Sequence, residues 1–245
     1  MKQILLMIAL AALVGCGKKP TEESVFEQGR PDVTKPSKPP AKTEAQIEAE
    51  NKAFAETKAK AEEGDSKAQG LLAWEYTYGE KKDPALAFEW SKKAAAQSDS
   101  KGEFILGRSF SLGQGVKQDF KEAVKWYQKA AVQGHAKAQV VLGFMYHQGQ
   151  GVNQDFKEAV KWYQKAAVQG DAYAQASLGN MYYNGKGVPQ DYMTAYVWYN
   201  IAAAKGDTQA AKWKDNTAKK MTPEQIAKAG ELVKEMVKKN PKLLK

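Results

Sequence analysis

The sequence predicts an all-α fold, an α-solenoid of about four helix-turn-helix repeats with helical caps at both ends. Two observations predict it: a tryptophan recurs every 36 residues, and the segment DFKEAVKWYQKAAVQG occurs twice unchanged, at 119–134 and 155–170. Such a period is typical of stacked helical units, each of which buries its apolar face only against its neighbours. The tryptophans of the series are Trp90, Trp126, Trp162 and Trp198.

The first sixteen residues have the pattern of a bacterial lipoprotein signal. A charged start precedes an apolar stretch at 4–14, which is too short to span a bilayer permanently. Residues 13–16, Leu-Val-Gly-Cys, resemble a lipobox, in which the cysteine becomes the mature N-terminus and carries lipid chains. We therefore expect 1–15 to be a removed signal peptide and Cys16, the only cysteine, to be lipidated. An ordinary signal peptide or a buried cysteine is the alternative.

The residue after the cysteine bears on the location. Gly17 stands where an Asp would resemble a signal for retention in the inner membrane. The expected location is therefore the outer membrane, with the protein facing the periplasm. A protein sent outside the cytoplasm is not expected to bind nucleic acid.

A proline-rich segment separates this signal from the first helix. Residues 17–42 hold five of the nine prolines and few apolar side chains, which predicts a disordered tether. Thr43-Glu-Ala-Gln46 then matches a capping box, in which a threonine and a glutamine satisfy the free N–H groups of a helix start. We expect a helix over about 44–62, so that 43–63 caps the stack.

Each repeat is predicted to contain two helices. In the unit at 134–169 the first helix is expected from Ala136 to Tyr146 and ends at a glycine-rich turn. The second is expected to begin after Asp155 as N-cap. Its apolar stripe should pack against neighbouring helices, with the tryptophan filling the space between them. The residues of this stripe are Ala159, Trp162, Tyr163, Ala166 and Ala167.

The pattern of these units resembles the Sel1-like repeat, a relative of the tetratricopeptide repeat. The motif A-x-A-Q-x-x-L-G-x-x-Y-x-x-G-x-G-V-x-Q-D-x-x-x-A-x-x-W-Y-x-x-A-A-x-x-G fits 136–170 and 172–206, whereas the first unit has a loop two residues shorter, Ala73 for Gly and Ser91 for Tyr. The resemblance implies a right-handed solenoid with repeats at 64–97, 98–133, 134–169 and 170–205. It also implies a protein-interaction surface rather than an enzyme.

The C-terminal region is expected to close the stack with helical caps and a basic tail, over 207–245. Thr222-Pro223-Glu224-Gln225 combines an N-cap, a proline at the first helical position and a capping-box glutamine, so a last helix should run to about Lys239. Residues 205–245 carry eleven lysines and five acidic residues, a net charge of +6. Two interpretations stay open: attraction to anionic lipid or an acidic partner, and a solvated lysine-rich cap.

The best-preserved repeats differ where a binding groove is expected. The second-helix segments 119–134 and 155–170, of the second and third repeats, are identical, whereas the first-helix segments 135–150 and 171–186, of the third and fourth repeats, differ at eight of sixteen positions. In the related tetratricopeptide geometry, first-helix residues line the concave face, and aromatic residues with arginine are typical binding anchors. The alternative is that some of them pack between helices. The predicted groove residues are Trp74, Lys101, Phe104, Arg108, Lys137, Val140, Phe144, His147, Tyr173, Asn180 and Tyr183.

These patterns predict a non-enzymatic, lipid-anchored, periplasm-facing scaffold that binds a protein or peptide in its groove. We expect a monomer without cofactor, held at the membrane through Cys16. We expect no metal site, because neither His135 nor His147 has a cysteine or carboxylate at ligand spacing. One alternative is an immunity lipoprotein that neutralises a secreted antibacterial toxin such as a phospholipase effector, a role that the resemblance permits. The least favoured alternative is an enzyme that acts on β-lactams or cell wall.

Overall fold

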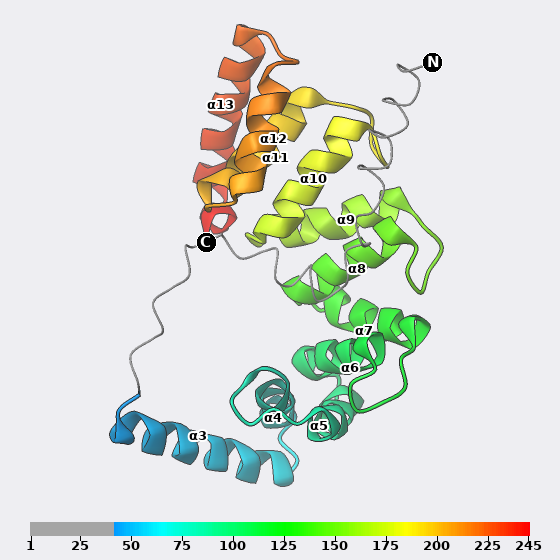
Figure 1. Cartoon of the computed structure of the whole chain (residues 1–245), viewed down its shortest axis with the longest axis vertical. Helices are drawn as coiled ribbons and strands as arrows, with labels where there is room; N and C mark the ends of the chain where they lie inside the picture. The colour runs from blue at the N-terminus through cyan, green and yellow to red at the C-terminus, as the bar shows by residue number, and fades with distance from the viewer. Residues whose placement is uncertain (1–41) are drawn as a thin grey trace, which may run out of the picture.

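The computed structural model describes residues 42–245, and within them the protein forms eleven α-helices, a final 3-10 turn and no strand. The helices stack in sequence order, from α3 at one end to α13 at the other (Figure 1). The arrangement is the predicted α-solenoid. The predicted signal peptide at 1–15, the lipidation site Cys16 and residues 17–41 of the predicted tether lie outside the described residues.

Four helix-turn-helix units form the middle of the stack. Their first helices are α4 (Ser66–Tyr78), α6 (Ser100–Leu112), α8 (Ala136–Gln148) and α10 (Ala172–Asn184). Their second helices are α5 (Pro84–Ala96), α7 (Phe120–Val132), α9 (Phe156–Ala167) and α11 (Tyr192–Ala204). The ends consist of α3 (Glu44–Glu62), α12 (Thr208–Ala218), α13 (Pro223–Lys239) and η1 (Pro241–Leu244).

Aspartate caps account for where most of these helices begin. Asp155 accepts hydrogen bonds from the backbone N–H groups of Lys157 and Glu158 at the start of α9, as the sequence predicts. Asp171 accepts one from Ala174 at the start of α10. Such a cap contributes about 1 kcal/mol. The start of α8 is an exception, because His135 holds the capping position and accepts from Ala138 through Nδ1.

In the last three units the most deeply buried aromatic side chain of the second helix is a tyrosine, next to the tryptophan that marks the repeat. Tyr127, Tyr163 and Tyr199 rank among the largest fully or almost fully buried side chains. Trp126, by contrast, is only partly buried, and Lys129 Nζ lies 3.9 Å from its ring centroid. Trp90, Trp162 and Trp198 are 7–8% exposed and belong to the packed core, so the prediction that the tryptophans fill the space between helices is confirmed for these three and is wrong only for Trp126.

A recurring polar contact joins one unit to the next. Gln139 donates from Nε2 to the carbonyl of Ala131 at 3.0 Å, and its Oε1 accepts from Gln169 Nε2 at 2.7 Å. Gln69 makes the same two contacts in the first unit, with Ala61 and Gln97. In the second unit this buried position is Glu103, which accepts from Gln133 at 2.7 Å.

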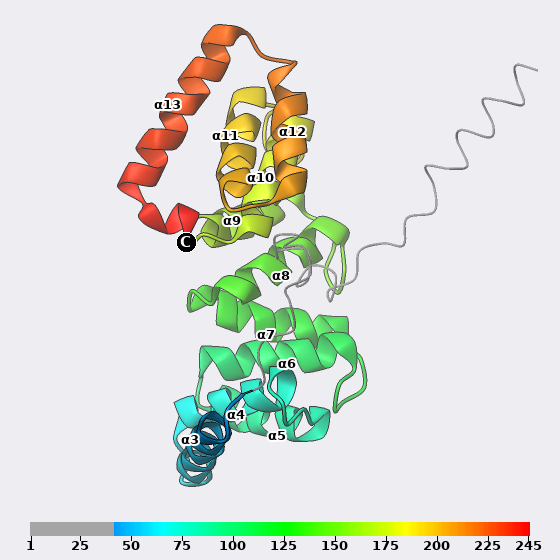
Figure 2. The same ribbon diagram turned by 60° about the vertical axis from the view of Figure 1, so that its left-hand side comes forward.

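The C-terminal segment folds back onto the fourth unit. Asn240 donates to the carbonyl of Val168 at 2.7 Å, and Gln175 donates to the carbonyl of Leu243 at 2.9 Å. Helix α13 stands apart from α12, and the turn that follows it brings the C-terminus back beside α9 (Figure 2). Its predicted apolar face is only partly buried, since Ala229 is its one fully buried residue.

Candidate binding groove

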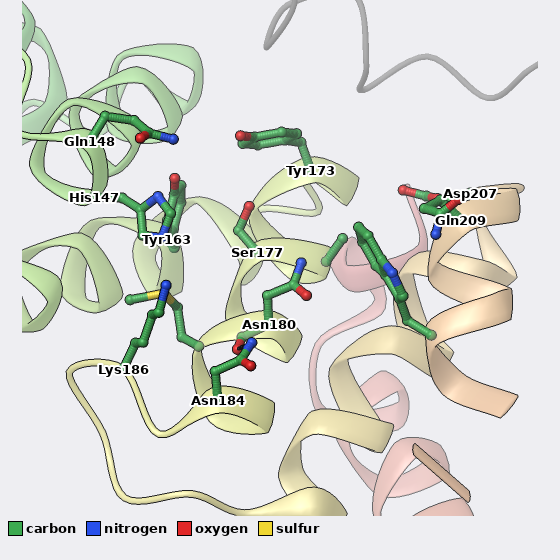
Figure 3. A pocket seen from close by; sticks show the side chains of 13 residues that line it. His147, Gln148, Tyr163, Tyr173, Ser177, Asn180, Asn184, Lys186, Asp207 and Gln209 are labelled. Atoms are coloured by element: carbon green, nitrogen blue, oxygen red, sulfur yellow. Dashed lines mark hydrogen bonds between the residues drawn. The ribbon is translucent and has the colours of Figure 1, made fainter. Parts of the chain in front are cut away.

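A cavity of about 480 Å³ opens on the face formed by α8, α10 and α12. Its floor is α10, where Tyr173, Ser177, Asn180 and Asn184 follow one stripe of the helix (Figure 3). This spacing places all four side chains on one face of the helix. The cavity is therefore built largely from the first helices of the third and fourth units and from α12, which follows them in the stack.

Two other helices and a loop form the rim of this cavity. His147 and Gln148, at the end of α8, lie on one side, with Lys186 of the loop after α10 below them (Figure 3). Asp207 and Gln209, at the start of α12, lie on the other side. Ala176, Met181, Tyr163 and Trp213 complete the lining.

Hydrogen bonds hold the polar floor in place. The Tyr199 hydroxyl donates to Asn180 Oδ1 at 2.9 Å, and Asn184 donates to the Asn180 carbonyl at 2.8 Å. The Tyr163 and Tyr173 rings lie 6.3 Å apart, edge to face. Because Tyr199 engages the oxygen of the Asn180 amide, the amide is fixed in orientation and its nitrogen can donate to a ligand carbonyl.

Burial favours the neutral forms of two tyrosines and one histidine around the cavity. Burial raises the pKa of Tyr173, and it raises the pKa of Tyr163 well above its usual value. Burial, followed by the nearby charge of Lys186, lowers the pKa of His147. Asp207 is engaged as the N-cap of α12, where it accepts from Ala210 at 2.8 Å. Amide, hydroxyl and aromatic groups therefore dominate, a combination suited to the backbone and apolar side chains of a protein segment.

The structure brings some of the predicted groove residues together at this cavity. His147, Tyr173 and Asn180 line it. Tyr183 is not among the lining residues and packs against Tyr192, with ring centroids 5.3 Å apart. The predicted groove is thus divided, and its C-terminal part coincides with the cavity.

A second group of predicted residues gathers around Trp74. Lys137 Nζ lies 4.6 Å from the Trp74 ring centroid, and Lys101 Nζ lies 5.7 Å from it. Tyr78 packs on the same tryptophan at 4.4 Å. This part of the face is aromatic and cationic, in contrast to the amide-lined cavity.

Four predicted groove residues are buried, so the expectation that they are exposed in the groove is wrong for them. Phe104, Val140 and Phe144 belong to the packed core between units. Phe104 stacks on His135 at 4.6 Å and lies 5.7 Å from Tyr127, so it fills an interface between helices rather than facing a partner. Arg108 is 9% exposed and is the only charged residue of the four.

The sequence prediction misses some of the lining residues. Trp213 stands 36 residues after Ser177, so the repeat period itself places it on the same face. The prediction assigns 207–245 only to a cap and does not extend the mapping into α12. Tyr163 is missed for another reason: it comes from a second helix and lies against Gly143 of α8.

The described residues hold no group of three or more His, Cys, Asp or Glu side chains arranged to bind a metal ion. Among the same residues, no helix combines the length and apolar character needed to cross a membrane.

Comparison with known proteins supports the repeat assignment. The Sel1 repeat family model matches residues 66–99, 100–135, 136–171 and 172–207, each beginning two residues after the predicted boundary. A crystal structure of a protective antigen present in uropathogenic Escherichia coli strains, which displays an SLR fold, is 34% identical with a TM-score of 0.72 over 79% of this chain. A Sel1 repeat protein from Oxalobacter formigenes is 36% identical with a TM-score of 0.62 over 67% of this chain. No curated protein matches.

The match does not extend over the whole of those proteins. The aligned region spans 42% of the Escherichia coli protein and 49% of the Oxalobacter formigenes protein. The likeness therefore concerns the repeat array.

Proposed function

Because this chain belongs to the Sel1 repeat family, whose members are generally protein-interaction scaffolds, we propose that it binds an extended protein segment in the cavity between α8, α10 and α12. The observation that carries the proposal is which parts of the repeat supply the residues that line the cavity. The cavity is lined mainly by positions of the first helices and the following loop at which the third and fourth units differ, such as Tyr173 in place of Lys137 and Asn180 in place of Phe144.

The chemistry of the cavity supports this kind of ligand. Asn180, Asn184 and Gln209 offer amide groups that can both donate to and accept from a peptide backbone. Tyr173 and Trp213 offer aromatic walls, and such side chains recur as anchors in protein interfaces. Scaffold behaviour, without catalysis, is the function that this lining favours.

Site-specific photocrosslinking in the producing cell tests the proposal. A crosslinker at Asn184 or Gln209, both exposed residues of the cavity lining, should capture a defined protein. The same crosslinker at Val132, on the exposed side of α7, is the matched control and should not capture it. Filling the cavity with Ser177→Trp should abolish capture at Asn184; capture that persists in this variant would reject the cavity as the binding site.

The identity of the captured protein separates the roles open to such a scaffold. A secreted toxin would make this protein an immunity factor. A resident envelope protein would make it an assembly scaffold.

We also propose that the protein is anchored in the outer membrane through lipid on Cys16 and faces the periplasm. The lipobox-like residues at 13–16 and Gly17 support this location. Metabolic labelling with an alkyne-bearing palmitate should mark the wild-type protein and not the Cys16→Ser variant. An unlabelled wild-type protein, or one that separates with the inner membrane, would count against the proposal.

A further inference from the structure

The cavity between α8 and α10 has a smaller counterpart two units earlier in the stack. It measures about 160 Å³, and its lining includes Thr77, Arg108 and Gln114. These residues hold the same places within their units as His147, Asn180 and Lys186, which line the larger cavity. The smaller cavity, which we call the Arg108 notch, is therefore a second instance of one recurring position between first helices.

The position between these two is filled. At the place of Arg108 and Asn180, the third unit carries Phe144, which is fully buried in the core between units. The face of the stack thus has an open position, a closed position and an open position in succession.

The short loop of the first unit contributes to the Arg108 notch. In the next three units a glutamine precedes the aspartate cap and donates to the end of the first helix, as Gln118 does to the Ser111 carbonyl at 2.7 Å. Lys82 stands at this place in the first unit and lines the notch instead. The notch therefore contains two cationic side chains and, among its lining residues, no acidic one.

Arg108 lacks the partner that a buried arginine ordinarily has. Only 9% of the residue is exposed, and it makes no ion pair with any residue that the structure describes. One Nη donates to Gln114 Oε1, the guanidinium lies 5.0 Å from the Tyr78 ring centroid, and the buried Nε atom has no hydrogen-bond partner. Asp83, which follows Lys82, is the N-cap of α5, and its Oδ1 accepts from the backbone N–H groups of Ala85 and Leu86.

An unpaired buried charge is costly, and the fork of an arginine matches a carboxylate. We propose that the Arg108 notch binds a carboxylate of an acidic protein segment, supplied either by an acidic residue or by the C-terminus of the partner polypeptide. Arg108 pairs with the carboxylate through its guanidinium group, and Lys82 adds a second positive charge. The proposal deepens the proposed function and rests on it for the identity of the ligand as a protein segment.

The size of the notch limits what enters it. A volume of about 160 Å³ accommodates a carboxylate and a few methylene groups, because a water molecule alone occupies about 30 Å³. The rest of the segment would lie outside, beside the Tyr78 and Trp74 rings that extend from Arg108.

The first test uses acetate as the smallest carboxylate probe. In the full-length protein, the NMR resonance of Arg108 Nε–H should shift and saturate as sodium acetate is added, and sodium chloride at the same ionic strength should not reproduce it. Lys82→Gln, which introduces the glutamine found in the other loops, should weaken the saturation. Lys121→Gln removes an equal charge from exposed α7 and is the matched control. An Nε–H shift that is the same in acetate and in chloride overturns the proposal.

The second test distinguishes the two sources of carboxylate. Three short peptides are compared: one with a central glutamate and an amidated end, one with glutamine and an amidated end, and one with glutamine and a free C-terminus. Either carboxylate should strengthen binding by about tenfold over the amidated glutamine peptide, because one charged hydrogen-bond pair is gained. Arg108→Gln should bring all three to equal affinity; equal affinities in the wild type reject the proposal.

Stability and cavity controls keep the outcomes separate. Arg108→Gln should unfold no more readily than the wild type, because it removes an unpaired buried charge; strong destabilisation would make Arg108 a structural residue and contradict the proposal. Ser177→Trp fills the other cavity and should leave acetate binding unchanged. If the wild-type protein does not bind acetate but a partner is still captured at Asn184, only this inference is rejected. If the wild-type protein binds acetate but no partner is captured at Asn184, only the proposed function is rejected.

Discussion

The ring of Tyr163 lies against Gly143, so closely that a Cβ built on that glycine would sit 2.8 Å from Tyr163 Cδ1. The same relationship joins Gly179 to Tyr199, at 2.5 Å. In the first unit both partners are different, since Ala73 replaces the glycine and Ser91 replaces the tyrosine. The glycine of the Leu-Gly pair is therefore explained by the tyrosine of the second helix, whose ring occupies the place of a Cβ.

We predict that Gly143→Ala destabilises the protein by about 1–3 kcal/mol, because the added methyl group overpacks a buried contact. Gly230→Ala in α13 is the matched control, since a Cβ there meets nothing within 4 Å. That change should stabilise the protein by about 0.5–1 kcal/mol through helix propensity. Urea unfolding of both variants measures the difference; stabilisation in both would show that the Tyr163 contact is loose.

The helices could be predicted from the sequence because their signals are local. The capping box at Thr43 opens α3 at Glu44, and Asp155 caps α9, as expected. The repeat period itself predicts the fold. The depth of each side chain is harder to predict, since Trp126 and Tyr127 are adjacent and only the packing of the next helix decides which of them is buried.

The candidate site could be predicted only as a face of the solenoid. The positions of His147, Tyr173 and Asn180 follow from the repeat geometry. Whether Phe104 and Phe144 point outward or pack between units depends on side-chain direction and on the neighbouring helix, neither of which a repeat alignment contains. The cavity also depends on Tyr163, from a helix that the comparison of copies assigns to the scaffold.

Glu103 gives a prediction about pH. Burial raises the pKa of this carboxyl, only partly opposed by the hydrogen bond from Gln133. A raised folded-state pKa means that the contribution of the group to stability is greatest below its unfolded pKa and is lost as the pH rises through the folded pKa. Glu103→Gln should therefore stabilise the protein at neutral pH by about 1 kcal/mol. The new glutamine would also supply an N–H donor at the position where Gln139, in the next unit, donates to the Ala131 carbonyl.

The reverse substitution in the next unit is the control for Glu103. Gln139→Glu should introduce the same pH dependence and destabilise the protein at neutral pH. Urea titrations across the acidic and neutral range compare the two variants. A stability difference between Glu103→Gln and the wild type that does not shrink towards acid pH would contradict the assigned pKa direction.

His135 gives a pH dependence of the opposite sign. Burial, followed by the charges of Lys137 and Lys101, lowers the pKa of this imidazole from 6.5 to about 4. The neutral ring is needed, because Nδ1 accepts from Ala138 at the start of α8. The stability that the ring contributes is fully present above the unfolded pKa and falls by up to about 3 kcal/mol as the pH decreases towards the folded pKa.

Substitution of His135 by aspartate, the residue that caps the other first helices, tests whether His135 causes the loss of stability at acid pH. His135→Asp should flatten the loss of stability between neutral and acid pH. His147→Gln is the control, because burial also lowers the pKa of His147 although that ring caps no helix. NMR titration of the two rings in the folded protein assigns each pKa, and a His135 ring that titrates at the ordinary value would remove the basis of the prediction.

The C-terminal turn should contribute to the stability of the fourth unit through one side chain. Leu243 is 2% exposed and belongs to the core that contains Val160 and Leu178, whereas the adjacent Leu244 is 43% exposed. Leu243→Ala should cost about 2–4 kcal/mol, because it leaves a cavity against α9 and α10. Leu244→Ala, the same change one residue later, should stay within about 0.5 kcal/mol of the wild type. Urea unfolding, with hydrogen exchange at Gln175, measures both effects; equal stability in the two variants would mean that η1 does not hold the fourth unit in place.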